Sequence, residues 1–359
     1  MAYKIEDIDR NFSSTVVDGC DLVFCNVKNE PFEIYGLYEP KKDGPFARLP
    51  DDGDFSTGVK VLKNNTAGAK VRFATDSPYI AIYAEIGEVC HMAHMTLTGS
   101  CGFDLYRQRG NEEVFVRPFI PQAAICHGRQ HYHSIIKLSD KKTHLTEYTV
   151  YFPLYNGVKK LEIGLAPGSR VEKGAPFTLK LPVVYYGSSI TQGGCASRPG
   201  NAYPALITHK TNIDHINLGF SGSCIAEPQM AEYIKDLPMC AFVYDYDYNA
   251  SSPEYLMETH ESFFLRIREK NPGLPVIIIS APRIAEKNDV NKRRDIIKAT
   301  YENAKKRGDK NVYFIDGGHL FDGPFADACT VDGVHPNDLG FQRMASSILP
   351  VLKEALKIQ

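Results

Sequence analysis

Hydrophobic and polar residues follow different patterns in the two halves of this chain of 359 residues. Up to about residue 180, β-branched and aromatic residues form short, partly alternating runs that end at Gly, Pro, Asn or Asp. The clearest runs are residues 69–76, 79–86, 113–119, 145–154 and 158–165. Many short strands at regular spacing predict an antiparallel sandwich or jelly roll.

From residue 182 onward, short apolar runs alternate with amphipathic stretches. The predicted strands are 182–187, 214–219, 241–246, 275–280 and 312–316. Ser252 and Pro253 suit the start of one helix, and Gly308 suits the end of another. We expect the last helix to bend or restart at Pro350. Strands alternating with helices predict an α/β domain, with a five-stranded parallel sheet covered on both faces.

The change of pattern places a domain boundary within residues 167–182, after a segment rich in Gly and Pro. A length of 359 residues also favours two domains. We therefore predict an all-β sandwich or jelly-roll domain over residues 1–178 and an α/β domain over residues 179–359.

Charge and cysteine content narrow the class of partner. A formal net charge of -2 gives no electrostatic case for nucleic acid or an anionic membrane, and no apolar run is long enough to span a bilayer. The nine cysteines are scattered and form no C-x-x-C pair, and the N-terminal residues lack the apolar stretch of a signal peptide. We expect free thiols and a cytoplasmic location, with a secreted or periplasmic location as the alternative if a leader was removed. The oligomeric state is left open.

Candidate chemistry lies where the predicted strands end, since ligands bind beyond the carboxyl ends of parallel strands. The segment "YYGSSITQGG" ends the first of these strands with Ser188 and Ser189. A serine attacks only when a base takes its proton and donors hold the oxyanion. Near the C-terminus, Asp332 and His335 have the spacing of an oriented base.

Two further strand ends carry candidate donors for an oxyanion. The small-residue turn "GFSG" includes Gly222, and "YDYDYNAS" includes Asn249, whose side-chain amide can donate. These four sites together resemble the SGNH hydrolases, also called GDSL esterases and lipases. The resemblance covers about residues 182–355. It implies a flavodoxin-like fold, Ser189 as nucleophile, His335 and Asp332 as base and acid, an oxyanion hole of Ser189, Gly222 and Asn249, and no cofactor or metal.

Two positions depart from the usual family pattern. Ser188 stands where the family name has Asp, and Asp247 stands where a Gly usually precedes the third-block Asn. Both variants are similar to a subgroup with an N-terminal β-sandwich, whose members resemble carbohydrate esterases and acyltransferases. The elbow pattern G-x-S-x-G does not occur, which disfavours an ordinary α/β-hydrolase.

Several residues have alternative interpretations. Ser189 alone would suit a helix N-cap, and Asp316 with His319 repeats the Asp-x-x-His spacing. Asn249 would also suit an Asx turn, with Asp245 and Asp247 as solvated or strand-end carboxylates. Arg283 follows the fourth predicted strand and is a candidate substrate contact or salt-bridge partner.

Histidines in the first half raise the question of a metal site. They are His91, His94, His127, His131 and His133. No cysteine or carboxylate framework accompanies them in sequence, so ordinary surface, core or substrate-lining roles are favoured over metal binding.

The sequence thus predicts a serine esterase that hydrolyses a small acyl ester, with an acetyl group on a carbohydrate as first choice. The alternatives are an acyltransferase that uses the same residues and a carbohydrate-binding protein with an inert hydrolase half. The expected partner is a small-molecule or saccharide ester.

Overall fold

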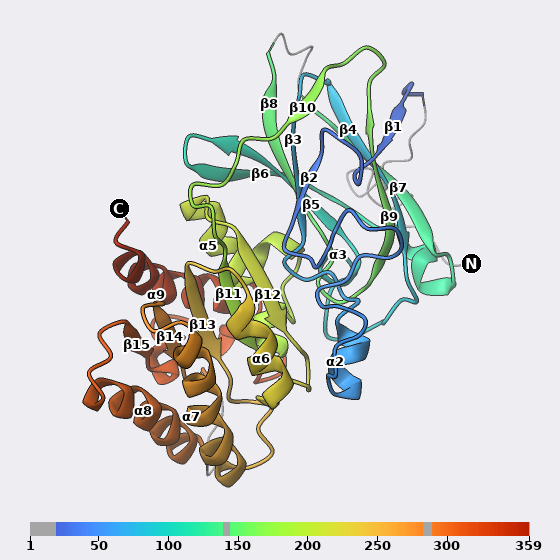
Figure 1. The fold of residues 1–359 in the computed structure, drawn as a ribbon. Coiled ribbons are helices and arrows are strands. Elements are labelled where there is room, and N and C mark those ends of the chain that lie inside the picture. The colour runs from blue at the N-terminus through green and yellow to red at the C-terminus, as the bar shows by residue number, and fades with distance from the viewer. Residues whose placement is uncertain (1–18, 139–143, 283–288, 359) are drawn as a thin grey trace.

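The computed structural model describes residues 19–138, 144–282 and 289–358. Figure 1 shows an antiparallel β-sandwich packed against an α/β layer structure. Both parts of the predicted fold class are confirmed: an all-β sandwich precedes an α/β domain with a five-stranded parallel sheet. No helix in these ranges is long and apolar enough to cross a membrane.

Two antiparallel sheets form the sandwich. The first has the order β1 (Val23–Asn26), β9 (Val158–Leu165), β4 (Tyr79–Ile86) and β7 (His131–Lys137). The second has the order β10 (Val171–Lys173), β3 (Lys70–Thr75), β8 (Thr146–Tyr151), β5 (Phe103–Arg109) and β6 (Glu112–Phe119), with β2 (Glu33–Tyr35) beside β3. Inward residues of both sheets, such as Ile82 and Phe73, share one buried apolar core. This burial explains the partial alternation in the sequence.

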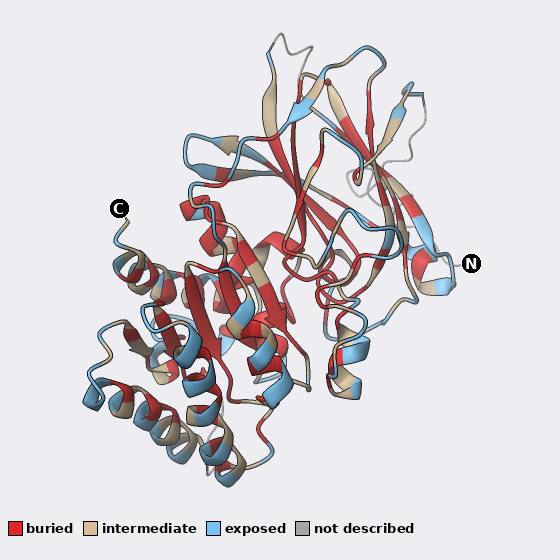
Figure 2. Ribbon diagram, viewed as in Figure 1, coloured by how far each residue is buried: buried red, intermediate tan, exposed pale blue. Residues whose placement is uncertain are grey.

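The second half contains a parallel sheet with the order β12 (His215–Gly219), β11 (Val183–Gly187), β13 (Ala241–Asp245), β14 (Val276–Ile279) and β15 (Val312–Ile315). One apolar cluster joins this sheet to α6 (Pro228–Asp236), α7 (Pro253–Lys270) and α8 (Val290–Lys306). A second cluster joins the opposite face to α5 (Tyr203–Thr211) and α9 (Asp338–Leu356). Figure 2 shows these strands as buried, which explains their continuous apolar sequence.

The helix boundaries largely follow the sequence signals. Ser252 caps α7 by accepting a hydrogen bond from the Tyr255 N–H, and Gly308 has a φ of 86° just after α8. The expected restart at Pro350 is wrong, because α9 continues through this residue to Leu356. Packing of Phe341, Met344 and Leu352 into one core outweighs the single hydrogen bond that a proline removes.

Buried cations tie the sandwich to the edge strand β12. The Arg48 guanidinium donates to the carbonyl oxygens of Asn217 at 3.0 Å and Gly219 at 2.7 Å. The Lys70 ammonium, whose side chain is fully buried, lies 2.7 Å from the Asp214 carboxylate. The sandwich therefore supports the strand that leads to the "GFSG" turn.

Candidate active site

The two adjacent serines at the end of β11 have different roles. Ser188 is the N-cap of α4 (Ser189–Gln192), and its Oγ accepts a hydrogen bond from the Ile190 N–H at 3.2 Å. Ser189 is therefore the first residue of the helix and not its cap. Gly187 is required at the strand end, because a Cβ there would lie 2.0 Å from the Thr191 Oγ1.

Ser189 lies at the topological switch point of the sheet, since β11 has β12 on one side and β13 on the other. Its Oγ is 2.9 Å from the His335 Nε2, and the His335 Nδ1 is 2.7 Å from the Asp332 Oδ2. Both distances allow hydrogen bonds, so the structure joins the three residues in one chain. This is the arrangement in which a histidine accepts a serine proton while a carboxylate orients it.

The Asp332 carboxylate is held in its ionised form. Partial burial raises its pKa, but hydrogen bonds from the His335 N–H, the His335 ring and the Val334 N–H outweigh burial and lower the pKa to about 2. A carboxylate that stays charged at neutral pH stabilises a neighbouring imidazolium.

The turn after β12 offers an unoccupied backbone donor. Gly222 has a φ of 66°, a conformation that favours glycine, and no backbone hydrogen bond of the described residues uses its N–H. The Gln192 Oε1 accepts from the Ser221 N–H at 3.0 Å, which ties this turn to α4. This hydrogen bond therefore fixes the position of the turn that contains Gly222 relative to α4.

Asn249 contacts the same turn. Its Oδ1 accepts from the Cys224 N–H at 3.3 Å, which fixes the orientation of the amide and leaves its NH₂ as the donating group. The structure thus brings the second and third sequence blocks together beside the nucleophile block. Asn249 and Gly222 are therefore linked through one turn, which Gln192 ties to α4, the helix that Ser189 begins.

The two aspartates before Asn249 are buried and bonded, so the alternative that they are solvated is wrong. Asp245 accepts hydrogen bonds from Thr191 at 2.9 Å and Tyr203 at 3.2 Å, and burial raises its pKa to about 7. Asp247 pairs with Arg293 at 2.8 Å, which holds the loop that carries Asn249. Both carboxylates are shielded from solvent by the side chains that bond to them, which come from α4, α5 and α8.

The rival Asp-x-x-His pair does not form a unit. The Asp316 side chain accepts from the Gly318 N–H, while the His319 Nδ1 lies 2.7 Å from Asp322. His319 is also 75% exposed, and the hydrogen bond to Ser189 comes from His335. Arg283 falls outside the described residues, so its expected role stays a prediction.

Three of the five histidines named in the first half have rings that lie against other rings. His131 and His133 lie on β7, where their rings contact Tyr83. His94, in contrast, lies beside the site, with its ring centroid 5.5 Å from that of His335. Cys195, which is distant in sequence, has its thiol within 4.8 Å of a ring nitrogen of His94.

Sequence reasoning missed the residues that the sandwich contributes to this region. The Tyr155 hydroxyl donates to the Ser189 carbonyl oxygen at 3.1 Å, and Arg48 stacks 4.6 Å from the Phe220 ring at the start of the "GFSG" turn. No local signal marks either residue, since their partners lie far away in sequence. Asn217 could have been found from the sequence, because it belongs to the segment "NLGFSG" that was already singled out. Its amide donates to the Thr191 carbonyl oxygen at 2.7 Å.

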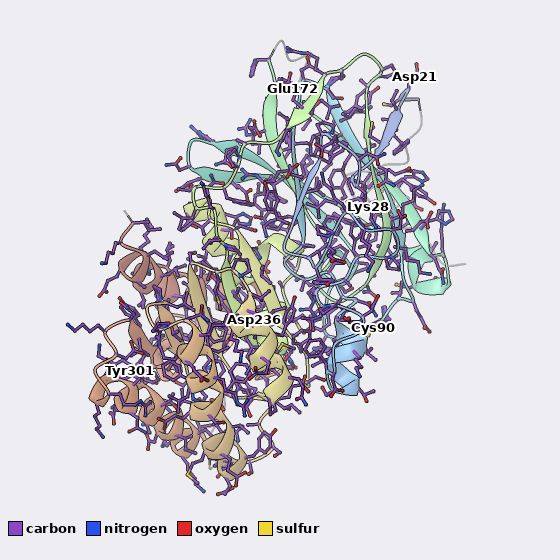
Figure 3. The ribbon with its side chains drawn as sticks, in the orientation of Figure 1. Asp21, Lys28, Cys90, Glu172, Asp236 and Tyr301 are labelled. Atoms are coloured by element: carbon purple, nitrogen blue, oxygen red, sulfur yellow. The ribbon has the colours of Figure 1, made fainter. Side chains whose placement is uncertain are left out.

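A cavity of about 760 Å³ is lined almost wholly by the first half of the chain, with Ser221 of the "GFSG" turn also in its wall. Its lining includes Tyr155, Val61, Leu62 and Cys90 from the first half and Ser221 from the second. In Figure 3, the labelled Cys90 lies next to α2 (Thr57–Leu62), which supplies two of these residues. The lining mixes apolar side chains with amides and charged groups, as ligand sites do.

The parallel sheet with Ser189 at the end of β11 and His335 before α9 can be compared with known proteins. Residues 180–353 match the model of the GDSL-like lipase/acylhydrolase family, and residues 22–171 match a model described as the N-terminus of SGNH-hydrolase-type esterases. The chain belongs to the GDSL-like lipase/acylhydrolase family and is an ester-bond hydrolase.

Solved structures share the fold of this chain over most of its length. A protein of Bacteroides ovatus described as a GDSL-like lipase is 30% identical, with a TM-score of 0.83, over 94% of this chain and 99% of its own. The salicylyl-acyltransferase SsfX3 of a tetracycline biosynthetic pathway is 20% identical, with a TM-score of 0.75, over 94% and 99%. A family two carbohydrate esterase of Clostridium thermocellum is 12% identical, with a TM-score of 0.61, over 82% and 94%. No curated protein gives a significant match.

Proposed function

We propose that this chain is a serine esterase that hydrolyses a small acyl ester, with an acetyl group on a carbohydrate as the substrate class. The observation that carries the proposal is the hydrogen-bonded chain from Ser189 through His335 to Asp332, with distances of 2.9 and 2.7 Å. Such a chain lets a serine hydroxyl act as a nucleophile at neutral pH.

In the proposed reaction, Ser189 Oγ attacks the ester carbonyl carbon while its proton passes to His335 Nε2. Asp332 stabilises the imidazolium, and the N–H groups of Ser189 and Gly222 with the Asn249 amide hold the oxyanion. The intermediate collapses as His335 returns the proton to the departing alcohol. A water molecule then attacks the acyl-enzyme by the same route and releases the acid.

The carbohydrate part of the proposal has two supports. The fold is shared with family two carbohydrate esterases, one of which is described in complex with cellohexaose. The cavity beside Ser221 also combines polar groups such as Asn64 and Lys159 with apolar side chains, a lining that suits the hydroxyls and the apolar faces of a sugar.

The experiment is a screen of acetylated sugars and synthetic acetyl esters with the wild type, Ser189→Ala and Ser188→Ala. We expect Ser189→Ala to lose hydrolysis while the circular dichroism spectrum is unchanged. Ser188→Ala is the matched control, because it removes only a helix cap worth about 1 kcal/mol and leaves the nucleophile. Turnover retained by Ser189→Ala would overturn the proposal.

Acyl transfer is the second candidate, since the fold is also that of a salicylyl-acyltransferase. In that reaction an alcohol takes the place of water at the acyl-enzyme. Adding an acceptor sugar or alcohol and measuring acylated product against free acid separates the two reactions. An inert carbohydrate-binding protein would show neither product.

A further inference from the structure

Three potential metal ligands from separate parts of the chain meet at the proposed catalytic histidine. His94 lies between β4 and α3 (Leu97–Ser100), Cys195 follows α4, and His335 precedes α9. One ligand atom of each residue lies within 4.8 Å of the others. Among the described residues, no second group of three such ligands lies this close together.

The separations suit a metal ion with little rearrangement. Zinc binds imidazole nitrogen at about 2.0–2.1 Å and thiolate sulfur at about 2.3 Å, so tetrahedral ligands on one ion lie roughly 3.5 Å apart. Because the three atoms lie within 4.8 Å of one another, each pair would have to approach by at most about 1 Å. His94 is exposed, and no hydrogen bond within the described part of the chain holds its ring, so a side-chain rotation brings it closer.

The ligand types select the ion. Two imidazoles and a thiol form a soft set that favours zinc over magnesium or calcium, which prefer oxygen ligands. Three protein ligands leave a fourth position for water, as in open zinc sites. Cys195 is 6% exposed, so this residue is largely shielded from solvent.

We propose that His94, Cys195 and His335 form a zinc site whose occupation reversibly inhibits the esterase. The inhibitory part rests on the proposed function of His335. Both ring nitrogens of His335 are engaged, Nε2 with Ser189 and Nδ1 with Asp332. A metal on either nitrogen removes the imidazole from this chain of hydrogen bonds.

The hydrogen bond between Asp332 and Nδ1 favours metal binding at Nε2. Asp332 would then remain bonded to Nδ1, and a carboxylate on the second nitrogen is the usual partner of a metal-binding histidine. Zinc binding replaces the Cys195 S–H proton, which leaves to solvent as the Zn–S bond forms. No oxidant or reductant takes part.

The test measures zinc binding and hydrolysis separately. Protein freed of metal with a chelator is titrated with ZnCl₂ against a chromogenic zinc indicator, and hydrolysis of a synthetic acetyl ester is followed at the same zinc concentrations. We expect one zinc per chain, loss of hydrolysis as it binds, and full recovery with EDTA.

His94→Ala is the key variant, because the exposed side chain is outside the proposed catalytic residues. We expect its basal turnover to be unchanged and its half-maximal inhibitory zinc concentration to rise about 10–100-fold. Cys195→Ser should show the same shift. His319→Ala is the matched control, because it removes an exposed histidine elsewhere, and it should keep wild-type sensitivity.

Each failure has a distinct meaning. Wild-type zinc sensitivity in His94→Ala would overturn the site, as would the absence of stoichiometric binding in a protein that hydrolyses esters. Stoichiometric binding that depends on His94 but leaves hydrolysis intact would overturn the inhibition, and with it the catalytic role of His335.

Discussion

Arg48 allows a test of whether the sandwich supports the "GFSG" turn, which carries the proposed oxyanion donor Gly222. Its guanidinium is 1% exposed and donates to three carbonyl oxygens, those of Leu62, Asn217 and Gly219. The perturbation is Arg48→Met, which keeps an apolar stem of similar length but removes all three donors and the charge.

The expected loss of stability is the difference between a favourable and an unfavourable contribution of Arg48. Three hydrogen bonds from a charged donor contribute about 1.5–3 kcal/mol each. Burial opposes them, as it lowers the Arg48 pKa from 12.5 to about 9, equivalent to roughly 5 kcal/mol. The variant regains that burial cost, so we expect a net destabilisation of about 2 kcal/mol.

Activity should fall more than stability suggests. Arg48 holds the end of β12 three residues before Gly222, and a misplacement of about 1 Å in a catalytic donor can cost roughly 10²-fold in rate. We expect kcat for a synthetic acetyl ester to fall about 10–100-fold at temperatures where the variant is fully folded.

The assays are urea unfolding followed by circular dichroism, and steady-state kinetics at one temperature well below the unfolding transition of every variant. Lys63→Met is the matched control, because Lys63 is a buried cation whose partners, Pro50 and Asp51, lie within the sandwich. It should lower stability without lowering kcat. Wild-type kcat in Arg48→Met, or an equal loss of kcat in Lys63→Met, would refute the reasoning.

Three further substitutions test the site. Asn249→Ala removes one proposed oxyanion donor, so kcat should fall ~10²–10³-fold with little change in KM. Asp332→Asn should lower kcat roughly 10⁴-fold near neutral pH, because an amide does not stabilise the imidazolium. Asp245 has a folded pKa of about 7, above its ordinary 3.8, so its contribution to stability is present below about pH 4 and lost as pH rises through 7. Asp245→Asn should therefore gain stability relative to the wild type between about pH 4 and 8.

Each of these outcomes has a clear opposite. A rate for Asn249→Ala close to that of the wild type would remove this amide from the oxyanion hole. Full activity of Asp332→Asn would show that another group orients His335. A pH-independent difference in urea midpoint between Asp245→Asn and the wild type would mean that Asp245 does not titrate with a raised pKa.

The fold and the core of the site were predictable because their signals are local or periodic. Strand β4 was predicted with its observed bounds of residues 79–86, since burial on one face imposes a partial alternation on the sequence. Ser189 was found from its position after a predicted strand, and the pair of Asp332 and His335 from its Asp-x-x-His spacing before the last helix, together with the resemblance to SGNH hydrolases. The sheet order then brings those positions to one edge.

The contributions of the sandwich were not predictable, because they depend on contacts between distant segments. Arg48 reaches carbonyl oxygens of β12 that lie 169 and 171 positions away, and Tyr155 reaches Ser189 across 34. A backbone carbonyl oxygen can accept a hydrogen bond whatever the side chain of its residue. The sequence at the accepting position therefore gives no sign of the contact. His94 likewise carried no sign that it would meet Cys195 and His335.

The buried bond between Lys70 and Asp214 bears on how this architecture can be inherited and re-engineered. A catalytic half joined to a foreign sandwich would keep the Asp214 carboxylate and the β12 carbonyl oxygens but lose the cations that now neutralise and fill that surface. Domain shuffling should therefore be tolerated only between parents that carry matching cations at positions 48 and 70. During evolution the two halves would then be selected as one unit, and chimeras are better joined elsewhere than at the linker.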